Sequence, residues 1–275
     1  MTTGPSGAAT AAPASPSPGL LSRLPIAQVA LGALGFLFLI GLWEIAPRIG
    51  WVRSESVPPF SEVVREIGNV LSDPDFWTNL RASAGRWAAG LGIAIAIGIP
   101  LGMLMGRFRV LFYSIDPILT VSYPVPKAAL ILIFVLWWGA GDLSRIAIIV
   151  TGCLIPIVIS SYHGAKAVEP RLLWSARSLG SGRVGTLARV VLPAALPQIL
   201  TGLRLAIAIS IFTLLASELL IRQSGVGAYM FTALDIGSNL VVWAVMVILA
   251  VIGFLLDFVY VRGVKLACRW LEEDV

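Results

Sequence analysis

The residues best suited to specific chemistry lie in one polar stretch, Glu169 to Pro197, between two long apolar runs. The stretch is too polar to cross a bilayer. Its single acid is Glu169, and its basic side chains are Arg171, Arg177, Arg183 and Arg189. The pattern predicts a short amphipathic helix beside a membrane, and the alternative is an ordinary basic loop.

Proline and glycine positions set the ends of this predicted helix. Pro170 can occupy a first helical turn, where its missing N–H costs nothing, and Gly180 suits a left-handed helix stop. One face of the helix is apolar, made of Leu172, Leu173, Ala176 and Leu179. A second helix is predicted from Val184 to Leu192, ending at Pro193.

Side chains typical of catalysis or metal binding are scarce elsewhere. His163 is the only histidine, and a residue at the membrane edge is the simpler interpretation of it. Cys153 and Cys268 form neither a disulfide framework nor a metal-binding spacing. The phosphate-binding loop of ATPases does not occur, so any ATP used would be hydrolysed by another chain.

The composition indicates an integral membrane protein. The chain has 275 residues, of which 57% are hydrophobic and 13% charged, whereas about 25% are charged in soluble domains. The formal net charge of +5 needs no nucleic-acid partner, because most basic residues flank the apolar runs. Runs near the bilayer-spanning length predict six spans at about 26–46, 87–105, 111–138, 144–161, 198–221 and 240–261.

The segments before and between the first spans have a different character. Residues 1–22 are rich in Ala, Pro, Ser, Gly and Thr and predict a disordered cytoplasmic tail, before a membrane domain of residues 23–275. The region 47–84 is predicted to be a long loop. It would carry a surface helix from Glu62 to Leu71, with Ser61 as its N-cap.

A few polar residues and prolines inside the spans are candidates for a translocation path or gate. Pro124 and Pro126 should bend the third span, and Lys127 beside them either lines the path or reaches the membrane surface. Arg204 lies within reach of the cytoplasmic surface. Glu218 is either a structural charge that bonds a neighbouring helix or part of a gate.

Basic residues give the orientation. Arg107 and Arg109 follow the second span, and Arg262 and Lys265 follow the sixth. Basic flanks favour the cytoplasm, so six spans place both termini on the cytoplasmic side of the membrane. The loop 162–197 then lies in the cytoplasm.

The polar stretch resembles the cytoplasmic signature of ABC-transporter permeases, which reads Glu-Ala-Ala, three residues, Gly, nine residues, Ile, any residue, Leu-Pro. The matching positions are Trp174-Ser175-Ala176, Gly180, Val190 and Leu192-Pro193. The continuation through Ser217-Glu218-Leu219 resembles the sulfonate, taurine and nitrate branch. The resemblance covers roughly residues 43–275, and it departs from the signature where Trp174 and Ser175 replace Glu and Ala.

The resemblance implies an all-α membrane protein with the six-helix fold of type I ABC importer permeases. It implies that a cytoplasmic helix docks in a groove on a separate ATPase, which binds the ATP and magnesium, so this chain binds no cofactor. The coupling residues would be Glu169, Arg171, Leu172, Leu173, Trp174, Ala176, Arg177, Leu179, Gly180, Leu192 and Pro193. Further partners would be an extracytoplasmic solute-binding protein, a second permease copy in a homodimer, and membrane lipid.

The resemblance also implies the solute, a sulfonate, taurine or nitrate-like oxyanion, with a thiamine precursor as the alternative. Two other classes of membrane protein are alternatives when the residues alone are considered. A secondary transporter would need buried acid or histidine relays and internal repeats, and a membrane enzyme would need paired carboxylates or a nucleophile with a base. The sequence shows no clear candidate for either class.

Overall fold

The computed structural model describes residues 25–268, with side chains for 31–266 and 268. These residues form helices joined by turns, and no strand occurs among them. The chain divides after Ser61 into two compact units, which are considered separately. The predicted tail, residues 1–22, lies outside the described residues.

The first unit contains α1, Pro25–Arg48, which extends two residues past the predicted end of the first span. Ser61 is not the N-cap predicted for the next helix, α2, because α2 begins at Phe60. The Ser61 backbone N–H and hydroxyl instead donate to the Glu44 carboxylate at 2.8 and 2.9 Å. Glu44 thus satisfies one of the N–H groups that a helix start leaves unpaired.

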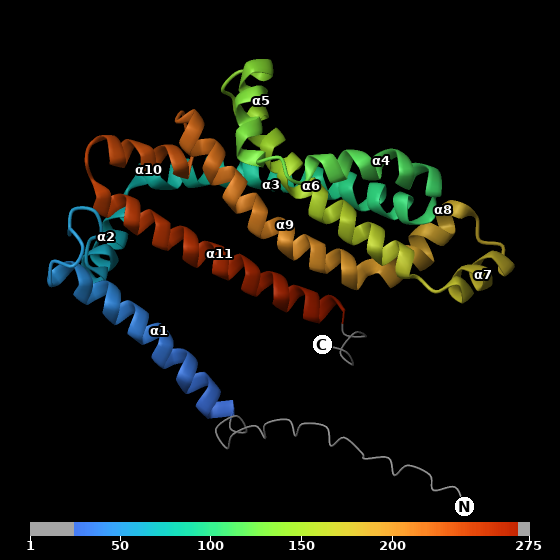
Figure 1. Cartoon of the computed structure of the whole chain (residues 1–275), viewed down its shortest axis with the longest axis horizontal. Helices are drawn as coiled ribbons and strands as arrows, with labels where there is room; N and C mark the ends of the chain where they lie inside the picture. Colours follow the sequence, from blue (N-terminus) through green and yellow to red (C-terminus); the bar gives the residue numbers. More distant parts are fainter. Residues whose placement is uncertain (1–24, 269–275) are drawn as a thin grey trace, which may run out of the picture. The chain divides into compact units, whose positions relative to one another are not determined.

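The remaining helices follow in chain order (Figure 1). Their bounds are α2 Phe60–Ser72, α3 Pro74–Arg107, α4 Arg109–Ser122, α5 Leu130–Trp138, α6 Asp142–Ala167, α7 Pro170–Ser178, α8 Arg183–Thr186, α9 Leu192–Ile221, α10 Val226–Asp235 and α11 Asn239–Ala267.

The predicted loop 47–84 is wrong in its second half. The surface helix expected at Glu62–Leu71 is present as α2, but α3 then begins at Pro74, well before the expected start of the second span. Asp73 caps α3, since its carboxylate accepts from the Asp75 N–H at 2.9 Å, and Pro74 fills a first-turn position that needs no N–H. The second span is therefore the membrane part of one 34-residue helix.

The core of the second unit is formed by α6, which packs along α3 on one side and α9 on the other (Figure 1). Glycines allow the close approach. A Cβ added at Gly98 would lie 2.7 Å from Ile157 Cγ2, and one at Gly102 would strike the Val158 carbonyl oxygen. Gly98 and Gly102, four residues apart, thus permit close helix packing, as small residues commonly do in membranes.

The third span is broken between α4 and α5. The two halves, Arg109–Ser122 and Lys127–Trp138, are bent by 85°, and Pro124 and Pro126 lie in the break. The Lys127 ammonium donates to the carbonyls of Ser122 and Val125. The predicted bend is confirmed, and Lys127 satisfies carbonyl groups that the break frees.

Membrane-spanning capacity agrees with the all-α prediction. Five of the described helical segments are long and apolar enough to cross a bilayer, and the bent pair can supply a sixth span. Mean hydropathy of the five ranges from 1.4 to 2.7. The chain is a multi-pass membrane protein.

Candidate functional site

Helix α7 has the ends that its sequence predicts. Pro170 occupies the first turn, and Gly180 adopts a φ of +78°, a left-handed conformation that favours glycine. The Ser181 N–H donates to the Ala176 carbonyl at 3.0 Å, and the Gly180 N–H donates to Arg177 at 2.9 Å. This closure ends the helix and turns the chain toward α8.

The apolar residues of α7 do not form one outward face. Leu173 and Ala176 are buried, and Leu173 packs with Met103, Ala165, Ile199 and other residues at the ends of α3, α6 and α9. Side chains that point outward are Leu172, Trp174 and Leu179, which are 48%, 63% and 87% exposed. Because the buried pair anchors α7 to its own chain, only the exposed set is available to a partner.

The segment after α7 differs from the prediction of a separate helix ending at Pro193. α8 spans Arg183–Thr186, and a π-helical segment, Leu187–Val191, leads directly into α9. The Leu192 N–H donates to the Leu187 carbonyl, five residues back. This wider turn accommodates Pro193, which cannot donate to the helix ladder, so α8 runs into α9 without a break, and only the turn 179–182 separates α7 from this continuous helix.

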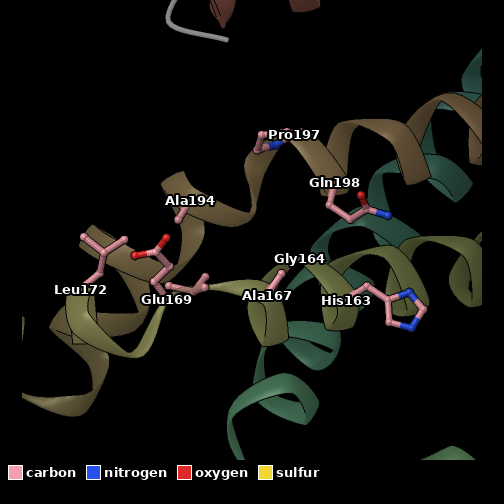
Figure 2. Close-up of a pocket in the computed structure, with 9 residues that line it drawn as sticks. His163, Gly164, Ala167, Glu169, Leu172, Ala194, Pro197 and Gln198 are labelled. Atoms are coloured by element: carbon pink, nitrogen blue, oxygen red, sulfur yellow. The ribbon is translucent and has the colours of Figure 1, made fainter. Parts of the chain in front are cut away.

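A cleft of about 470 Å³ opens beside the start of α7. Figure 2 shows Glu169 and Leu172 from the α7 side of the cleft, Ala194, Pro197 and Gln198 from α9, and His163 on α6. Among the described residues, neither the Glu169 carboxylate nor the Gln198 side-chain amide has a hydrogen-bond partner. The cleft therefore presents one acid at the base of an otherwise basic helix.

A cluster of buried charges lies at the opposite end of α9, beside α10. Glu218 is fully buried and accepts from Ser83 Oγ at 2.7 and 2.8 Å and from Arg86 Nη1 at 2.8 Å. Arg86 Nε also donates to Asp142 at 2.7 Å, and Arg145 Nη1 lies 3.4 Å from the same carboxylate oxygen. The two arginines and two acids balance, which limits the cost of burying them.

The cluster also holds the turn that joins α9 to α10. Arg86 and Arg145 both donate to the Ser224 carbonyl, at 3.1 and 3.3 Å, and the Gly227 N–H donates to Glu218 at 3.1 Å. A Cβ at Gly225 would fall on the Glu218 carboxylate. Glu218 thus ties α9 to α3 and to the turn before α10.

α10 has one further polar anchor. The Tyr229 hydroxyl donates to the Asp73 carboxylate at 2.8 Å. Burial, and then this hydrogen bond, raise the pKa of the Tyr229 hydroxyl. The phenol therefore stays protonated, and a donor to Asp73, well above neutral pH.

Arg204 does not lie in the Glu218 cluster. Its Nε and Nη2 bind the two carboxylate oxygens of Asp257 at 2.7 and 2.8 Å, which joins α9 to α11 in a side-on pair. Both side chains are partly exposed. The candidates for a path or gate therefore separate into three places: Lys127 at the break, Arg204 on α9 facing α11, and Glu218 beside α10.

Sequence analysis missed Arg86, Asp142 and Arg145 as functional candidates. The signal was present, because all three lie at the starts of the second and fourth predicted spans, and Glu218 lies at the end of the fifth. The predicted topology puts these three span ends, and so all four residues, at one membrane face. The described residues contain no cluster of histidine, cysteine or acidic side chains suited to a metal ion.

Comparison with known proteins places the chain among transport proteins. Residues 98–264 match the family described as binding-protein-dependent transport system inner membrane component. The taurine transport system permease of Escherichia coli is 32% identical over 86% of this chain and 88% of that protein. A protein of Bacillus subtilis, named provisionally as an aliphatic sulfonates transport permease, is 30% identical over 80% of this chain and 79% of its own. The formylaminopyrimidine transport permease of Halalkalibacterium halodurans is 32% identical over 81% and 88%.

Proposed function

Because the chain belongs to the family of binding-protein-dependent transport system inner membrane components, we propose that it is the permease of an ATP-driven importer for a small sulfonate such as taurine. Family members act in transport and are not enzymes, and a binding-protein-dependent system includes a solute-binding protein and an ATPase. Family membership favours this interpretation over an ion-gradient-driven transporter.

The solute class is supported by relatives that cover most of this chain. Two of them are named for taurine and for aliphatic sulfonates. A thiamine-precursor pyrimidine is the second candidate, supported by the formylaminopyrimidine permease at the same 32% identity as the taurine permease.

Coupling to the ATPase is proposed to use the exposed side of α7. Leu173 holds the helix against the ends of α3, α6 and α9, and Ala176 is buried beside it on the same helix, which leaves Leu172, Trp174 and Leu179 for the partner. Trp174 occupies the first signature position and is an aromatic side chain of the kind that anchors interfaces. ATP and magnesium belong to the partner, and this chain supplies the docked helix.

The arrangement of charges supports an orientation with α7 in the cytoplasm. Arg107 and Arg109 lie at the junction of α3 and α4, where the neighbouring Gly106 packs against Ala165 near the end of α6 that leads to α7, while α10 lies at the other end of α9 (Figure 1). We place both termini in the cytoplasm of a bacterial inner membrane, and we place α10 on the side of the solute-binding protein. Two copies of the chain would form the pathway.

Reconstitution tests this proposal. The permease is placed in liposomes with its cognate ATPase, solute-binding protein is added on the extracytoplasmic face, and ATP on the opposite face. Uptake of taurine, an alkanesulfonate, nitrate and a formylaminopyrimidine is compared. ATP-dependent uptake of a sulfonate is the expected result. Uptake of the pyrimidine alone would support the second candidate, and uptake without ATP would contradict the coupling.

A further inference from the structure

A second cavity, of about 270 Å³, lies between α3, α9, α10 and α11. It is separate from the cleft beside α7 and plays no part in the coupling proposed above. Its wall consists of Leu80, Ser83, Ala84, Trp87, Ile211, Leu214, Leu215, Glu218, Val226, Leu249, Ile252 and Leu256.

The few polar side chains of this wall already have partners. Ser83 and Glu218 bond each other, Arg86 adds a third bond to the Glu218 carboxylate, and Trp87 Nε1 donates to Ser210 Oγ at 2.7 Å. A water molecule needs two to four polar partners to stay in such a space. The wall therefore has few free polar groups for a water molecule, and the space is better suited to a hydrocarbon chain.

The cavity borders the apolar surface of helices that cross the membrane. Phe212, Val251 and Leu255 each adjoin a lining residue in sequence and are 68%, 52% and 51% exposed. α11, which carries two of them, lies in the most apolar candidate span of the described chain, with a mean hydropathy of 2.7. Lipid chains in contact with this surface lie next to the helices that form the cavity wall.

The cavity also has the length of part of a lipid chain. Lining residues span seven-residue steps on three helices, from Leu80 to Trp87, from Ile211 to Glu218 and from Leu249 to Leu256. At 1.5 Å per residue, each step is about 10 Å long. One leaflet of the hydrocarbon core is about 15 Å thick, so one acyl chain can lie along most of its depth here.

We propose that this cavity binds one acyl chain of a membrane phospholipid. The chain would fill the space between α11 and the pair α3 and α9, and it would cover Glu218 and Ser83 with hydrocarbon. Water would then be kept from the buried Glu218–Arg86 pair, whose attraction is stronger in a low-dielectric surrounding. The bound lipid is thus expected to stabilise the α10 end of the protein.

Native mass spectrometry tests the proposal on the whole protein. The permease is purified in a mild detergent, then exchanged into nanodiscs of phosphatidylethanolamine and phosphatidylglycerol, and bound phospholipid is counted. Ala84→Phe places a ring in the cavity from α3, and Ile252→Phe does so from α11. Ala89→Phe, at an exposed position of α3 outside the cavity, is the matched control.

The expected result is one retained phospholipid per copy in the wild type and in Ala89→Phe, and none in either filled variant. Added phospholipid should raise the Tm of delipidated wild type and leave the Tm of Ala84→Phe unchanged. Equal retention in all variants, or no retained lipid in the wild type, would overturn the proposal.

Discussion

Replacing Glu218 by glutamine tests whether this residue is a structural charge or part of a gate. The carboxylate is fully buried and receives bonds from Ser83, Arg86 and the Gly227 N–H. Glutamine keeps the shape and one acceptor oxygen. It removes the negative charge opposite Arg86. It also places an NH₂ group where a carboxylate oxygen accepted before, so this NH₂ donor faces the N–H donor of Arg86 or of Gly227.

The size of the effect follows from burial. Removing one partner of a buried ion pair costs about 3–5 kcal/mol, because the other charge stays buried without compensation. Asp142 still contacts Arg86 at 2.7 Å, but its side chain is 66% exposed, so it compensates weakly. Because glutamine retains part of the hydrogen bonding, we expect about 3 kcal/mol, which is a fall in Tm of about 6–12 °C for a chain of this size.

The assay is thermal unfolding of the purified protein in detergent, followed by tryptophan fluorescence, alongside uptake in liposomes. Arg86→Gln and the double variant complete a mutant cycle, in which the pair should show a coupling of about 1–3 kcal/mol. A Tm equal to the wild type with uptake abolished would refute the structural role and support a gate. Additive losses in the double variant would refute the pairing itself.

Three further sets of substitutions probe other parts of the molecule. Trp174→Ala should weaken ATPase binding, measured by pull-down, about tenfold or more without lowering Tm. Leu173→Ala should instead lower Tm in a melting curve, by the loss of a buried anchor. The reverse pattern would mean that Trp174 is the buried anchor and Leu173 the contact with the ATPase. Gly225→Ala should lower Tm and distort the turn before α10, since φ is +107° and the new Cβ meets the Glu218 carboxylate; an unchanged Tm would contradict that contact. Arg204→Asp and Asp257→Arg should each reduce the amount of folded permease in membranes, and the double exchange should restore it; no rescue would argue against the ion pair.

Much of the helical framework could be predicted from hydropathy and from helix-end residues. Each predicted span falls on a helix, or for the third span on the bent pair α4 and α5, because a membrane helix needs about 20 apolar residues. Pro170 and Gly180 mark the ends of α7 in the sequence itself. The start of α3 was missed, although Asp73-Pro74 is a standard helix start, because the polar first turns of α3 lie outside the hydrophobic window.

Faces and partners were harder to predict. The spacing of Leu172, Leu173 and Ala176 defines one stripe on an isolated helix, but it does not say which members the protein buries against its own bundle. Burial of Leu173 depends on Met103 and Ile199, which are far from it in sequence. The Glu218 cluster was not predicted for the same reason, since its hydrogen bonds join residues more than 130 positions apart in the sequence.

The two candidate regions are connected through the same pair of helices. Leu173 fixes α7 to the ends of α6 and α9, and Glu218 fixes the other end of α9 to α3 and to the turn before α10. Between these ends, glycine contacts such as Gly202 against Ser160 leave no space for α6 and α9 to slide independently. Under the proposed coupling, a pull on α7 would be passed to α10 by these packed helices as one body. The broken segment between α4 and α5, where Lys127 replaces ladder hydrogen bonds, is the place where the chain would bend.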